Sequence, residues 1–211
     1  QRTALQPLMQ EFEQIIIPRV HNFFGHEWSP GIDGDPRIYI LYAEGMGKSV
    51  AGYYSPKDEY SQLAHEYSNE KEIFYLNADI IALDDPGLPG TLAHEFQHMV
   101  HWANDSNEET WMNEGASVLS ELLTGNMPRG FDHAFIANPD LQLNAWSASD
   151  GPESIPHYGA AFLFLEYFLE RFGESATRAL VAHQANGFAA MDAVLQQLNI
   201  VDPLYGNPIN I

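Results

Sequence analysis

One short segment of the chain carries residues whose types and spacing could bind a metal and activate water: His94-Glu95-Phe96-Gln97-His98. Because a helix turns about 100° per residue, histidines four positions apart lie about 40° apart on one face. Neutral imidazoles are good zinc ligands, and zinc lowers the pKa of a bound water towards neutrality. Glu95 projects about 100° around the helix from His94, so it can take a proton from that water. The alternative is an exposed helical face with two solvated histidines.

A catalytic zinc needs a third protein ligand, and two residues downstream are candidates. His101 lies seven positions after His94, near the same face, whereas Glu114 stands in Trp111-Met112-Asn113-Glu114-Gly115. A short loop over 104–109 would let the next helix fold back antiparallel and deliver the carboxylate. We therefore favour Glu114 as the ligand and expect His101 to line the cleft or pack in the core. His101 and Asn104 stand where the metzincin pattern has glycine and histidine, so that family is excluded.

Hydrophobic spacing predicts the elements of the first half of the chain. Apolar residues at intervals of three and four favour a helix over 3–17, with a stop or kink at Pro18. Runs of β-branched and aromatic residues predict strands over 37–42 and 72–76. Between them, 45–69 reads as a long loop or a short hairpin.

The second half reads as mainly helical. A breaker cluster over 86–90 precedes the metal helix, expected over 92–104, and a second helix is expected over 111–124. After a loop over 128–156, helices are predicted at 158–172 (closed by Gly173), 174–185 and 188–198. Strands early and helices late indicate an α+β fold.

The composition excludes several classes of protein. Asp and Glu number 29 against 9 Lys and Arg, and the formal net charge of −20 argues against nucleic acid or an anionic membrane as partner. The absence of cysteine excludes disulfides, thiolate metal sites and cysteine nucleophiles. No apolar run reaches the ~18 residues that a membrane span requires. A start at Gln1 suggests a processed chain, and 201–211 is expected to be a tail or linker towards a possible further domain.

The segments H-E-F-Q-H-M and W-M-N-E-G together resemble the gluzincin branch of zinc metallopeptidases, whose third ligand is a glutamate on the helix after H-E-x-x-H. The wider pattern is similar to hyicolysin-like secreted bacterial peptidases over roughly residues 1–200. It includes D-G-D-P-R-I-Y-I-L, G-Y-Y-S-P-K-D-E-Y, N-E-K-E-I-F-Y-L-N and Y-G-A-A-F-L-F-L-E-Y. The resemblance implies a zincin-like peptidase domain over 1–200, with a helix and sheet over 1–90 and a helical part over 91–200. It also implies a secreted or cell-surface location.

The same resemblance implies how a substrate would be held. In this clan a strand antiparallel to the substrate lies just before the metal helix, and Ile73 to Leu76 match that position. Their free edge would hold an extended polypeptide by main-chain hydrogen bonds, although an ordinary core strand is the alternative. A tyrosine or histidine from a downstream helix stabilises the oxyanion, which points to Tyr158, with His157 in reserve. The alternative for Tyr158 is capping or packing of its own helix.

Two features depart from the thermolysin type. Those enzymes carry an aspartate four residues after the ligand glutamate, which orients a zinc histidine. This chain has Val118 there, so Ser117 or a backbone carbonyl would have to replace it. The chain also lacks the carboxylate spacing of an EF-hand loop. Calcium is a candidate ligand at Asp33-Gly34-Asp35 and Asp84-Asp85, and the commoner alternative is that these acidic loops are simply solvated.

The main hypothesis from the sequence is a zinc-dependent peptidase that hydrolyses peptide bonds through a metal-activated water. One alternative is a zincin-like binding or cell-surface module with little or no turnover, and another is hydrolysis of a different carbonyl or ester bond. The assigned residues are the ligands His94, His98 and Glu114, the base Glu95, and the oxyanion donor Tyr158 or His157.

Overall fold

The computed structural model describes residues 2–127, 130–146 and 152–211. By its internal contacts the chain forms two compact units, Gln1–Ala103 with Ser120–Arg129, and Asn104–Leu119 with Gly130–Ile211. The first unit contains a small three-stranded sheet, and the regular elements of the second unit, among the described residues, are helices. The fold is therefore α+β, as the order of strands and helices along the sequence predicts.

The first unit begins with a longer helical segment than the sequence predicts. Helix α1 (Arg2–Glu11) runs through a π-helical turn (Phe12–Ile16) into α2 (Ile17–Phe24). Of the two alternatives at Pro18, the stop is not observed, and the regular α-helix is instead interrupted just before this proline. In the π-helical turn the N–H of Ile17 bonds the carbonyl of Phe12, five residues back. This turn interrupts the regular ladder at the point where a proline ring would clash with it.

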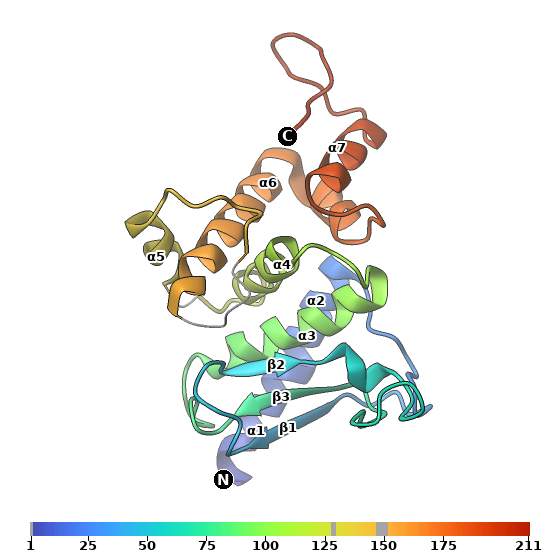
Figure 1. The fold of residues 1–211 in the computed structure, drawn as a ribbon, viewed down its shortest axis with the longest axis vertical. Coiled ribbons are helices and arrows are strands. Elements are labelled where there is room, and N and C mark those ends of the chain that lie inside the picture. The colour runs from blue at the N-terminus through green and yellow to red at the C-terminus, as the bar shows by residue number, and fades with distance from the viewer. Residues whose placement is uncertain (1, 128–129, 147–151) are drawn as a thin grey trace. The chain divides into compact units, whose positions relative to one another are not determined.

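The sheet consists of β1 (Tyr39–Ala43), β2 (Gly52–Tyr54) and β3 (Ile73–Asn77) in the order β1-β3-β2 (Figure 1). Strand β3 pairs with β1 in parallel and with β2 antiparallel, and all five of its residues are buried. The predicted strands at 37–42 and 72–76 thus agree to within two residues. The loop over 45–69 proves to contain β2 and a 3₁₀ turn at Pro56–Glu59.

Helix α3 (Leu88–Asn104) packs on this sheet through the N-terminal helical segment. The ring of Phe12 lies 5.9 Å from that of Phe74 on β3 and 5.4 Å from that of Phe96 on α3. The helix begins four residues earlier than the sequence predicts and includes Pro89 and Gly90. A proline is tolerated there because the N–H groups of a first helical turn have no partner within the helix.

The second unit contains most of α4 (Thr110–Leu123), with α5 (Phe131–Ala137), α6 (Ile155–Val181) and α7 (Gly187–Gln197) (Figure 1). The ring of Trp111 contacts those of Phe164 and Phe188, at 5.8 and 5.1 Å between centroids. The predicted loop over 128–156 contains α5, and its residues 128–129 and 147–151 lie outside the described residues.

Gly173 lies within the span of α6 with a φ of 83°, outside the helical region, so the chain kinks there. The predicted break at this glycine is confirmed. At the C-terminal end, Val201 forms an isolated β-bridge with Pro208. The interpretation of 201–211 as a linker stays a prediction.

Candidate metal centre

The two histidines of the H-E-x-x-H segment lie together on α3. The ring centroids of His94 and His98 are 4.8 Å apart with the ring planes at 81°, and both side chains are half-buried. Because they are one helical turn apart on a rigid element, both rings can face a single ion.

The carboxylate of Glu121, near the end of α4, orients one of these histidines. Its Oε1 lies 3.0 Å from Nδ1 of His94, and the two side chains are only 7% and 12% exposed. With Nδ1–H donating to this carboxylate, Nε2 becomes the nitrogen that can bind a metal. Glu121 also contacts Gly90, where an added Cβ would lie 3.2 Å from its Oε2, so the absence of a side chain at position 90 admits the carboxylate.

Glu121 is thus a candidate for the orienting role for which the sequence offered only Ser117 or a backbone carbonyl, and the role expected of Ser117 stays a prediction. The hydroxyl of Ser117 donates to the carbonyl of Asn113 at 3.2 Å, and Val118 is fully buried. The sequence does contain a signal for Glu121, because it stands seven residues after Glu114 and hence on the same helical face.

Glu95 is 5% exposed and lies against β2. An added Cβ on Gly52 would stand 3.0 Å from Oε1 of Glu95 and 2.9 Å from the carbonyl oxygen of Tyr75. Only a residue without a side chain lets the strand pass this close to the carboxylate. The sequence analysis did not identify Gly52, since a single glycine in a loop-like stretch carries no distinguishing pattern.

The strand expected to offer a free edge is not an edge strand. Ile73 to Leu76 belong to β3, which pairs with β1 on one side and with β2 on the other. Neither edge of this strand is therefore free to form main-chain hydrogen bonds with a peptide. This prediction is wrong because the three-residue strand β2, too short to recognise by its pattern, occupies the position. Among the described residues, the strands at the two edges of the sheet are β1 and β2.

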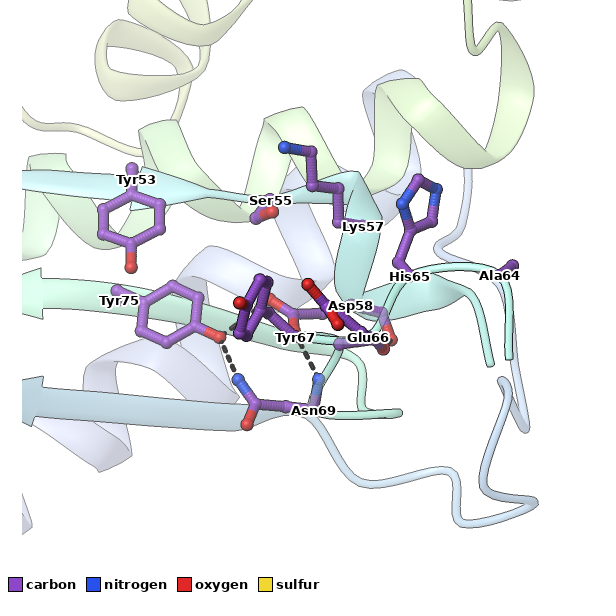
Figure 2. A pocket seen from close by; sticks show the side chains of 11 residues that line it. Tyr53, Ser55, Lys57, Asp58, Ala64, His65, Glu66, Tyr67, Asn69 and Tyr75 are labelled. Carbon is purple, nitrogen blue, oxygen red and sulfur yellow. Dashed lines mark hydrogen bonds between the residues drawn. The ribbon is translucent and has the colours of Figure 1, made fainter. Parts of the chain in front are cut away.

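A pocket of about 530 Å³ is lined by Tyr53 and Tyr75 (Figure 2). Because side chains alternate along a strand, Tyr53 lies on the face of β2 opposite the one where Gly52 meets Glu95. Tyr53 and Tyr75 stack at 4.4 Å between ring centroids on this face, and Asn69 Nδ2 donates to the hydroxyl of Tyr75 at 2.6 Å. That hydroxyl in turn donates to Asp58 at 2.7 Å. Lys57 and His65 add basic groups, so the lining offers aromatic faces together with groups of both charges.

The other residues singled out from the sequence lie in the second unit. Glu114 is half-buried on α4. Tyr158, in the first turn of α6, stacks on Phe131 at 5.2 Å and meets Trp146 edge to face at 5.0 Å. His157 contacts the same tryptophan, and its Nδ1 is buried with no hydrogen-bond partner among the described residues. The roles assigned to these residues remain predictions.

His101, the rival ligand, is fully buried in α3, as the expectation of a packed residue has it. Burial and the neighbouring His98 lower its pKa to about 3, so the imidazole is neutral. Its Nδ1 lies 3.4 Å from Nε2 of Gln97.

The acidic loops considered for calcium already have partners from their own chain. Asp33 pairs with Lys71, and Asp35 pairs with Arg37, which lowers the pKa of Asp35 to about 2. Asp85 accepts the backbone N–H of Gly87 at 2.7 Å and so helps to start α3. These contacts favour solvated loops, and calcium remains only a prediction.

Comparison with known proteins gives one informative match. No family model matches the chain. It is 25% identical over 219 residues to the neutral metalloprotease ShpI of Staphylococcus hyicus, covering 92% of this chain and 48% of that protein. The chain thus spans about half the length of the relative it matches. Among the described residues, no helix is both long and apolar enough to span a bilayer. The similarity supports a metalloprotease family, and with it a metal cofactor.

Proposed function

We propose that this chain is a zinc-dependent peptidase whose metal is bound by His94, His98 and Glu114. The observation that carries the proposal is the His94–Glu121 hydrogen bond of 3.0 Å beside a second histidine one turn away. A buried carboxylate that fixes the tautomer and orientation of an imidazole is the usual support of a zinc-binding histidine. The two imidazoles and one carboxylate are also the donor set of a catalytic zinc site with an open position.

The geometry of α4 supports Glu114 as the third ligand. Glu114 and Glu121 are seven residues apart on one continuous helix, so they share a face and are separated by about 10.5 Å along the axis. Glu121 already faces the metal helix through His94. Because Glu121 points to the side of His94, Glu114 points to the same side of α4, two turns closer to the N-terminus of that helix.

Zinc at this position would act as a Lewis acid and lower the pKa of a bound water. Glu95 would accept a proton from that water and deliver it to the leaving amine, because its buried carboxylate follows His94 directly along α3. Strand β2 would keep this carboxylate in place through Gly52. Tyr158, or His157 in its place, would donate a hydrogen bond to the oxyanion.

A polypeptide substrate has a natural binding edge at β2. One edge of β2 pairs with β3, and the opposite edge has no partner strand among the described residues. An extended peptide could therefore add to the sheet at that edge. Side chains of such a peptide alternate between the two faces of the sheet. One set would lie on the side of Glu95, and the other on the side of Tyr53 and its pocket (Figure 2). No observation favours the alternative of a binding module without turnover.

The test is the Glu95→Gln variant, digested against a broad peptide library with and without a zinc chelator. We expect the wild-type protein to cleave peptides only when zinc is present. The variant should keep its zinc and lose at least about a hundredfold of the rate, the lower limit for a missing general base. Glu13→Gln, an exposed glutamate of the first unit that does not line this pocket, is the matched control and should cleave normally. Full activity of the Glu95 variant would refute the base assignment, and cleavage that resists the chelator would refute the metal.

A further inference from the structure

A second group of metal-ligating side chains lies in the first unit, at the end of α2. His21 stands in the last turn of this helix, which ends at Gly25 with a φ of 98°. The reversal of the chain at this glycine returns His26 and Glu27 towards His21. One ligand atom from each of the three side chains lies within 4.8 Å of the others.

The three side chains face one another closely. Nε2 of His21 is 2.5 Å from Oε2 of Glu27, and the rings of His21 and His26 are 4.2 Å apart between centroids. The side chains of His21 and Glu27 are 21% and 11% exposed, whereas His26 is exposed. The group is therefore anchored by two sheltered donors and reached from solvent on the side of the third.

Both histidines act on the carboxylate of Glu27. Burial works against its charge, but the hydrogen bond from His21 and the nearby His26 outweigh burial and lower its pKa below the ordinary value. An ion pair with His21 alone would account for this carboxylate. The second imidazole lies within 4.8 Å of both groups as well, so all three side chains can reach a single ion.

We propose that His21, His26 and Glu27 form a second zinc site, distinct from the one on α3. Two imidazoles and a carboxylate suit zinc and related transition metals better than calcium or magnesium, which prefer oxygen ligands. Three protein donors leave a fourth position for water on the exposed side. The proposal does not depend on the proposed function, because none of its residues belongs to the catalytic group.

The position of this site indicates what it would do for the protein. The ring of His21 lies 5.5 Å from that of Phe96 on α3, next in sequence to Glu95. An ion bound to His21 and to the segment after Gly25 would fix the end of α2 against the metal helix. Because a ligand that binds only the folded state stabilises it, zinc at this site would raise the melting temperature.

The experiment is the zinc content of the full chain after dialysis against buffered zinc, measured for a set of histidine variants. His26→Ala and His98→Ala should each lose one equivalent relative to the wild type, and the double variant should lose two. His133→Ala, which removes another exposed histidine, is the matched control and should lose none. Should His26→Ala fold poorly by circular dichroism, Glu27→Gln replaces it with the same expectation.

The outcomes separate this proposal from the proposed function. If His26→Ala and Glu27→Gln bind as much zinc as the wild type, His21 and Glu27 form an ion pair only, and the second site is refuted. If His98→Ala keeps all of its zinc while His26→Ala loses one equivalent, the catalytic site is refuted and the second site stands. A zinc-dependent rise in melting temperature that persists in His98→Ala and disappears in the double variant supports the stabilising role.

Discussion

Two places in the first unit bury glutamates, and they differ in what faces the carboxylate. Glu121 faces the imidazole of His94 at 3.0 Å, which donates a hydrogen bond to it. Glu59 and Glu72 are each 2% exposed, and one oxygen of each has no hydrogen-bond partner among the described residues. Burial and the charge of Glu72 raise the pKa of Glu59 to about 8, against a hydrogen bond of 3.1 Å from Tyr54.

This difference teaches what makes a buried carboxylate useful for chemistry. A carboxylate that meets an N–H donor can orient an imidazole, as Glu121 does for His94. A carboxylate that meets another acid is held in its neutral form and affects mainly the stability of the fold. The predictions below test this distinction.

The largest expected effect comes from removing Glu121. Glu121→Ala frees the ring of His94, so zinc affinity should fall roughly 10- to 100-fold, with a matching loss of peptidase activity at limiting zinc. Glu121→Gln should restore part of the affinity because its amide oxygen still accepts the hydrogen bond. Glu59→Gln, which changes the buried pair of Glu59 and Glu72 instead, is the matched control and should bind zinc as the wild type does. Equal zinc affinities in all four proteins would show that Glu121 does not support the metal.

A smaller effect is expected at the strand that confines Glu95. Gly52→Ala places a Cβ about 3 Å from the carboxylate and the carbonyl of Tyr75, so one of them must move. Displacement of a base by a fraction of an ångström should lower kcat by about 10- to 100-fold. Zinc content should stay unchanged, since the atoms nearest to this Cβ position belong to Glu95 and Tyr75, which are not proposed as ligands. A fall in zinc content with normal kcat at saturating metal would contradict the assignment.

The smallest effect concerns the pH dependence of stability. Folded Glu59 keeps its proton up to about pH 8, whereas the unfolded chain releases it near the ordinary value of 4.5. Between these values the folded state binds more protons, so the free energy of unfolding falls as the pH rises. Glu59→Gln removes this contribution, and its melting temperature should rise relative to the wild type from pH 5 to pH 8.

Thermal melts across that range, at fixed zinc, measure this difference. Glu66→Gln, which removes an exposed glutamate, should run parallel to the wild type. A Glu59→Gln curve that is also parallel to the wild type would show that Glu59 is ionised in the folded protein.

The sequence predicts long, strongly patterned elements well and short ones poorly. The spacing of apolar residues placed α3 and α4, and the β-branched run placed β3, because periodicity over many residues reflects one buried face. It missed β2, whose three residues carry no period, and therefore misassigned the edge of the sheet. It left open whether the chain stops or kinks at Pro18, because local sequence does not reveal the π-helical turn that precedes this proline.

The placement of the candidate site was predictable where it depends on neighbours along one helix. Four-residue spacing gave His94 and His98, and the same rule at seven residues gives Glu121 once Glu114 is considered. Gly52 was not predictable, because its importance lies in a contact with Glu95 across forty-three positions of sequence. Contacts of this kind depend on strand pairing, which a single sequence does not specify.

The most direct test of the central claim is an anomalous diffraction map of the zinc-loaded protein recorded at the zinc edge. The account predicts a peak about 2.0–2.2 Å from Nε2 of His94, a nitrogen of His98 and a carboxylate oxygen of Glu114, with water at the remaining position. A map without an ion at His94 and His98, or with an ion there whose third protein ligand is not Glu114, would contradict it.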